Sequence, residues 1–114
     1  MCKLNVSDFM SLGFNRVESS ILLYFFQNKD KEIYIQDLKK IGIRQSEVCL
    51  SFPNLMSFIE RRKDDSETPG RPAHIYKLKI GAIDEIYELI YKTMESMESI
   101  KEKLELLTRE WYSK

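Results

Sequence analysis

Hydrophobic residues recur at helical spacing near the start of the chain. The run NRVESSILLYFFQ, from Asn15 to Gln27, has apolar residues every three or four positions, which predicts an amphipathic helix. Asn15 suits the N-cap, and Glu18 three residues later completes the pattern of a capping box. The preceding stretch SDFMSLG predicts a short helix ending at Gly13. We therefore expect the first 27 residues to form two helices that contribute to the core.

A short strand and two further helices are predicted next. EIYI, residues 32–35, is too short for a helix and rich in β-branched and aromatic residues, so we expect a short strand. QDLKKIGI predicts a short helix stopped by Gly42, and a further helix begins at about Gln45. Four residues of that helix share one face, at i, i+4, i+7 and i+11: Val48, Phe52, Leu55 and Ile59. Two helices joined by a tight glycine-containing turn are typical of a helix-turn-helix.

Near Phe58 the pattern becomes strand-like. FIERRK and HIYKLKI are separated by the polar, turn-forming DDSETPGRPA, which predicts a hairpin with a long tip. Four residues of the second strand share one face by the period of two: His74, Tyr76, Leu78 and Ile80. The order helix, strand, helix, helix, strand, strand is that of a winged helix.

The last third of the chain predicts one long helix from Ala82 to about Trp111, without Gly or Pro. Its apolar residues form a heptad seam over four repeats, interrupted at Thr93. The seam consists of Ile83, Ile86, Ile90, Met97, Ile100, Leu104, Leu107 and Trp111. At roughly 1.5 Å per residue the helix spans about 45 Å, more than a small body can cover. We expect it to pair with a second copy of the chain; folding back onto its own body is the alternative.

These elements predict an α+β fold, mostly α, with a winged helix-turn-helix domain over residues 1–81. Residues 82–114 would form a C-terminal coiled-coil or dimerisation helix. No apolar run approaches the roughly 18 residues of a transmembrane helix, and no signal-peptide pattern is present. We therefore expect a cytoplasmic protein with no membrane association.

Charge is unevenly distributed along a chain whose net charge is zero. Residues 38–80 carry nine basic and five acidic residues, whereas residues 1–37 have a net charge of −1 and residues 81–114 of −3. A local basic excess can hold a polyanion on a neutral molecule. The alternative is that these charges only solvate the surface.

The stretch LKKIGIRQSEVCLSFPNLMSFIERR, followed by GRPAHIYKL, resembles archaeal winged-helix transcriptional regulators of the TrmB/MarR-like kind. The similarity covers roughly residues 15–90. The matching positions are Arg44, Gln45, Glu47, Val48, Gly70, Arg71, Pro72, Tyr76 and Leu78. This resemblance implies a dimeric regulator that binds double-stranded DNA. The chain departs from the pattern at Leu50, Phe52 and Pro53, which shifts the expected base contacts toward the first turn of the helix.

Several residues have the chemistry of DNA contacts. Base edges are read by Arg, Asn, Gln and Ser, which are present as Arg44, Gln45, Ser46 and Asn54. Arg71, between Gly70 and Pro72 at the tip of the hairpin, suits a minor groove or a phosphate. Candidate phosphate contacts are Lys39, Lys40, Arg61 and Lys63. Capping and plain solvation are the alternatives for all of these residues.

Other functions have less support in the sequence. No acid–base pair, activated nucleophile, phosphate loop or metal-ligand spacing is recognisable, so we expect neither an enzyme nor a cofactor. Aromatic residues near the long helix could form core or line a pocket for a small-molecule effector of unknown identity: Tyr24, Phe25 and Phe26, with Tyr87, Tyr91 and Met94. The rival function is a protein-interaction module without DNA binding, docking through Cys49, Leu50 and Pro53.

Pro53 lies in the middle of the helix expected to read DNA. It cannot donate an N–H to the Cys49 carbonyl, and a mid-helix proline costs about 3 kcal/mol. The sequence leaves two outcomes: one kinked continuous helix, or a helix ending near Ser51 and a second starting at Pro53.

Overall fold

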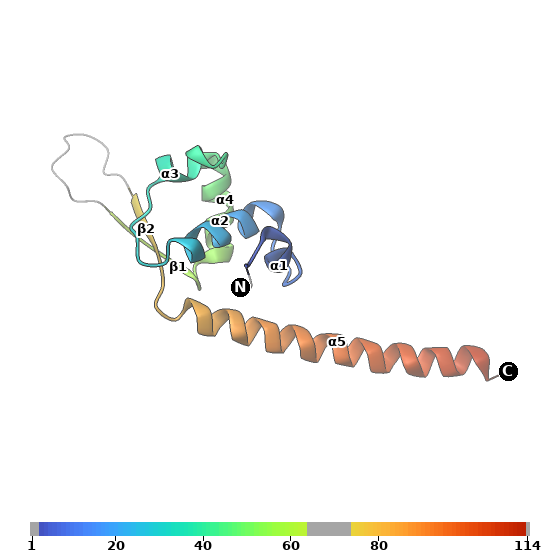
Figure 1. Ribbon diagram of the computed structural model, residues 1–114. Helices are drawn as coiled ribbons and strands as arrows, with labels where there is room; N and C mark the ends of the chain where they lie inside the picture. The colour runs from blue at the N-terminus through green and yellow to red at the C-terminus, as the bar shows by residue number, and fades with distance from the viewer. Residues whose placement is uncertain (1–2, 64–73, 114) are drawn as a thin grey trace.

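A computed structural model describes residues 3–63 and 74–113 of the chain (Figure 1). The elements, in chain order, are α1 (Val6–Met10), α2 (Arg16–Gln27), α3 (Ile35–Lys40), α4 (Gln45–Leu55), β1 (Ile59–Lys63), β2 (His74–Leu78) and α5 (Ala82–Tyr112). The described chain is mostly helical, with one small antiparallel sheet and a long C-terminal helix. The predicted class, α+β and mostly α, is confirmed.

Side-chain caps fix where α1 and α2 begin. Asn15 Oδ1 accepts the backbone N–H of Glu18 at 2.8 Å, and Glu18 Oε1 accepts the N–H of Asn15 at 2.9 Å. Asn5 and Asp8 form the same reciprocal pair at the start of α1. Gly13, with φ of 105°, turns the chain between the two helices in a conformation that other residues rarely adopt. The capping box predicted at Asn15 is confirmed.

A tight turn at Gly42, with φ of 91°, joins α3 to α4 and confirms the predicted stop. Helix α4 continues through Pro53 and ends at Leu55. The proline lies in the last turn, where little helix follows the missing hydrogen bond, so the disruption is small. Of the two outcomes for Pro53, the structure has the single continuous helix.

Strands β1 and β2 pair antiparallel, with Ile59 opposite Leu78 and Lys63 opposite His74. Ile33 adds one bridge, exchanging two backbone hydrogen bonds of 2.8 Å with Tyr76. The strand predicted over residues 32–35 is wrong beyond this bridge. The Asp37 carboxylate accepts the Tyr34 N–H at 2.9 Å and caps α3. The backbone is therefore helical from Ile35 onward.

Two positions predicted to share a face with other residues of their element also differ. Ile59 does not continue the face of α4, because that helix ends at Leu55; it begins β1 and is buried there. Ile80 lies beyond the end of β2 at Leu78 and is fully exposed.

The core lies between α1 to α4 and the sheet, with α2 contributing most to it. The largest side chains with under 2% exposure include Ile21, Leu22 and Phe25 of α2, which meet Leu38 and Leu55 of α3 and α4. Burying one such side chain stabilises the fold by about 1.5–3 kcal/mol. This packing sets the orientation of α4, and therefore decides which of its faces remains outside.

Helix α5 leaves the body at Ala82, which is fully buried, and extends far beyond it (Figure 1). Ile86 packs against the core, whereas every described residue after Thr93 is exposed. The molecule measures 76 × 27 × 24 Å along its principal axes. The predicted long helix is confirmed. No helix of the described ranges combines the length and apolar character needed to cross a membrane.

Candidate nucleic-acid interface

The outer face of α4 is defined by what its inner face buries. Val48, Ser51 and Leu55 point into the core. Opposite them, at i, i+3, i+4 and i+7, lie four exposed residues that we call the α4 stripe: Ser46, Cys49, Leu50 and Pro53. Leu50 is 80% exposed, although it is in the middle of a helix whose other side is core. The α4 stripe is therefore a narrow, mainly apolar strip directed outward.

The first turn of α4 presents polar side chains. Gln45 and Ser46 open the helix, and both are exposed. The N–H of Arg44, the N-cap residue, donates to Glu47 Oε1 at 2.9 Å, which fixes the helix start. Three of the four residues predicted to touch base edges, Arg44, Gln45 and Ser46, are thus brought together at one exposed helix end, whereas Asn54 lies in the last turn of α4.

Basic side chains precede and follow α4. Lys39 and Lys40 occupy the last turn of α3, where a positive charge complements the helix dipole, and both are exposed. Lys63, at the far end of β1, is exposed as well. These three lysines of the central sequence therefore lie at the surface, on the elements adjoining α4.

Arg61 takes a position that the sequence did not predict. Its guanidinium carbon lies 4.7 Å from the centre of the Phe52 ring, a cation–π geometry. Phe52 in turn meets Tyr76 edge-on, with ring centres 5.8 Å apart. Burial raises the pKa of the Tyr76 phenol, and the hydrogen bond and positive charge of Arg61 act in the opposite direction. Arg61 thus connects α4 to the sheet, a role visible only once the fold is known.

Arg62 of β1 has a partner outside the sheet. Its guanidinium forms an ion pair with Glu32, which lies just before the bridge at Ile33. Both side chains are about half exposed, so the pair contributes little to stability.

Asn54 has a partner inside the protein. Its amide Nδ2 donates to Glu18 Oε2 at 2.7 Å, linking α4 to the start of α2. Glu18 is only 5% exposed, so this contact satisfies a buried carboxylate. Because 36 residues separate the pair, no local spacing revealed it. The amide of Asn54 is thus engaged in a structural contact, while its predicted role in DNA binding stays a prediction.

Arg71, predicted at the tip of the hairpin with Gly70 and Pro72, lies outside the described residues.

Comparisons of the chain with protein-family models, characterised proteins and solved structures find no match. Among residues 3–63 and 74–113, no three His, Cys, Asp or Glu side chains are grouped as metal ligands would be.

The seam of α5 divides into two parts. Ile86 and Ile90 are half-buried and line a cavity of about 180 Å³ with residues of the body, among them Phe9 and Phe26. Tyr87, Tyr91 and Met94, expected at such a pocket, are more than half exposed and do not line it.

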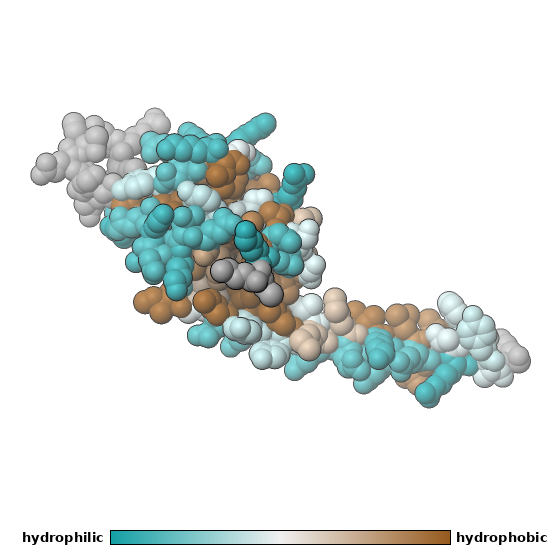
Figure 2. Space-filling view, in the orientation of Figure 1, coloured by the Kyte–Doolittle hydropathy of each residue, from teal (hydrophilic) through white to brown (hydrophobic). Residues whose placement is uncertain are grey.

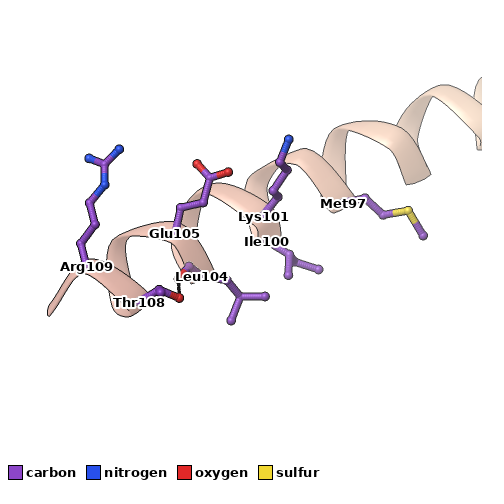
Figure 3. A pocket seen from close by; sticks show the side chains of 7 residues that line it. All are labelled: Met97, Ile100, Lys101, Leu104, Glu105, Thr108 and Arg109. Carbon is purple, nitrogen blue, oxygen red and sulfur yellow. Dashed lines mark hydrogen bonds between the residues drawn. The ribbon is translucent and has the colours of Figure 1, made fainter. Parts of the chain in front are cut away.

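Beyond these turns, the seam is uncovered. Met97, Ile100 and Leu104 are 55–61% exposed and project to one side of α5, whereas Lys101, Glu105 and Arg109 project to the other (Figure 3). Hydrophobic surface follows this part of the helix (Figure 2). Exposed apolar strips of this length are typical of surfaces that contact a partner.

Proposed function

We propose that this protein is a homodimeric, sequence-specific DNA-binding transcriptional regulator of the winged-helix type. The observation that carries the proposal is the arrangement around α4: an exposed first turn with Gln45 and Ser46, on the second of two helices joined by a tight turn, with exposed lysines on the adjoining elements. The antiparallel pair β1–β2, which follows α4 directly, corresponds to the wing.

In this proposal α4 enters the major groove, which is wide enough to admit a helix. Gln45 and Ser46 meet base edges there, with Arg44 beside them. Lys39, Lys40 and Lys63 contact phosphates, and so does Arg71 of the wing.

The uncovered part of the α5 seam supports the homodimer. Its seam residues are exposed from Met97 to Trp111, and heptad spacing favours pairing with an identical helix. A two-fold dimer presents two copies of α4, which predicts a roughly palindromic site with half-sites about one helical turn, some 34 Å, apart.

A salt titration of binding to duplex DNA tests this proposal. Each lysine that contacts a phosphate contributes about 0.9 to the slope of log affinity against log salt. We expect Lys39→Ala and Lys40→Ala each to lower the slope by about that amount, whereas Lys101→Ala on α5 leaves it unchanged. Absence of salt-dependent binding at low ionic strength, in a protein that folds normally, would overturn the proposal.

The second candidate function is a winged-helix module that binds a protein rather than DNA. The observation that favours it is the mainly apolar α4 stripe, in which Leu50 is 80% exposed. The same titration separates the two functions, since the interaction module binds no duplex.

A further inference from the structure

The α4 stripe has a composition that phosphate binding does not explain. Three of its four residues are apolar, and none is charged. Leu50 is 80% exposed in the turn after the polar first turn that is proposed to enter the major groove, and Pro53 is exposed in the last turn. If α4 lies in the groove, these side chains face the base edges together with Ser46.

The size and surroundings of the α4 stripe favour DNA as its occupant. A stable protein interface takes roughly 20–30 residues a side, and the α4 stripe has four. The basic side chains nearest to it in the chain, Lys39, Lys40 and Arg44, are all exposed, which is the charge expected beside a polyanion.

The major groove offers an apolar side chain one particular partner. Thymine carries a methyl group at C5 of its ring, whereas cytosine and uracil carry hydrogen there, and leucine-like surfaces contact that methyl group. Neither Leu50 nor Pro53 has a side-chain hydrogen-bonding group, so neither can read an amide or carbonyl edge.

We infer that the α4 stripe selects pyrimidines carrying a 5-methyl group, with Leu50 as the main specificity-determining residue. This inference rests on the proposed DNA-binding function. It assigns discrimination to methyl contacts in the middle of α4, whereas Gln45 and Ser46 supply hydrogen bonds at its start. A methyl group buried on binding contributes about 0.8 kcal/mol, which corresponds to about a fourfold change in affinity.

Removing the methyl groups from otherwise identical DNA tests the inference. Binding is measured with an alternating dA–dT duplex and with the same duplex containing deoxyuridine in place of thymidine. The phosphates are unchanged, so the electrostatic part of the affinity cancels in the ratio. We expect the thymine duplex to bind at least about fourfold more tightly, since one methyl group or more is buried per α4. In the converse pair, alternating dG–dC gains affinity when its cytosines carry a 5-methyl group.

Two variants assign the effect to the α4 stripe. Leu50→Ala removes the side chain without disturbing the core, because Leu50 is already exposed, and the ratio between the two duplexes should fall toward one. Met56→Ala is the matched control: Met56 is 55% exposed immediately after α4 but lies outside the α4 stripe, so its replacement should preserve the ratio.

The possible results separate the inference from the proposed function. Salt-dependent binding to both duplexes with equal affinity would overturn the inferred selection of 5-methyl pyrimidines and would leave the proposed DNA-binding function unaffected. A preference for thymine that survives Leu50→Ala would overturn the assignment to Leu50. Failure to bind either duplex at low salt would overturn both.

Discussion

At the scale of single residues, buried polar groups stabilise the body through hydrogen bonds between its helices, as buried apolar side chains do through packing. Glu18 has 5% exposure, yet its two carboxylate oxygens accept hydrogen bonds from the Asn15 backbone and from the Asn54 amide. One residue therefore caps α2 and holds the last turn of α4 in place. That turn is the one containing Pro53, where the helix lacks a backbone hydrogen bond of its own.

Replacing Glu18 tests this double role. We expect Glu18→Ala to lower the free energy of unfolding by about 2 kcal/mol, because it removes a cap and leaves the Asn54 amide without its carboxylate. Urea denaturation followed by circular dichroism measures the change. Asn54→Ala, which leaves the cap intact, should cost about 1 kcal/mol. Equal losses in the two variants would show that the cap contributes nothing.

Ser19 presents the opposite case. Its side chain is fully buried, and its Oγ finds no hydrogen-bond partner among the described residues. A buried hydroxyl without a partner is unfavourable. We therefore expect Ser19→Ala to raise the free energy of unfolding by about 1 kcal/mol, measured in the same denaturation experiment. Ser20→Ala is the control, since that hydroxyl already donates to the Arg16 carbonyl at 2.8 Å. A destabilised Ser19→Ala variant would contradict the expectation.

At the scale of elements, helical periodicity and caps predicted most of the fold. The box at Asn15, the stop at Gly42 and the long helix from Ala82 all follow from spacing over a few residues. The wrong strand prediction concerns competition between neighbouring residues. Residues 32–35 have strand-forming side chains, but the cap supplied by Asp37 starts α3 within that stretch.

The candidate site was less accessible from the sequence, because its decisive contacts join distant residues. Arg61 over Phe52 connects a strand to a helix, and Asn54 on Glu18 connects α4 to α2. A pattern of spacing contains no information about such pairs. It did identify the exposed first turn of α4, since the outer face of a helix follows from the inner one.

Helix α5 offers two leucines for a matched test of the dimer. Leu104 lies on the seam and Leu106 on the opposite side of the helix, and they are 56% and 60% exposed. A dimer buries two copies of Leu104 at about 1.5–3 kcal/mol each. Leu104→Glu should therefore raise the dissociation constant of the dimer at least about 100-fold, as measured by sedimentation equilibrium.

Leu106→Glu introduces the same charge at nearly the same exposure, and it should leave that dissociation constant close to the wild-type value. If both variants weakened association equally, charge on α5 would be the cause, and the seam would lose its role. If neither did, the proposed pairing through the seam would be wrong.

At the scale of the whole molecule, the structure joins a small packed body to a long helix whose outer part has no cover in the described chain. A folded state that pairs through this helix is stabilised by mass action. We expect the melting temperature of the wild-type protein to rise by a few degrees for each tenfold increase in protein concentration. Differential scanning calorimetry checks this. The Leu104→Glu variant should melt at a temperature independent of concentration.

The joint between β2 and α5 has a consequence for the spacing of DNA sites. The Lys79 N–H donates to the Phe58 carbonyl at 2.8 Å, the Ala82 N–H donates to the Lys79 carbonyl at 3.1 Å, and Ala82 is fully buried. These contacts hold residues 79–82 against the body. They therefore restrict rotation of α5 relative to the body. In a dimer that binds DNA as proposed, the two reading helices are therefore held at one separation and one rotational phase. Inserting about half a helical turn of DNA, roughly five base pairs, between the half-sites would place the second one on the wrong side of the duplex.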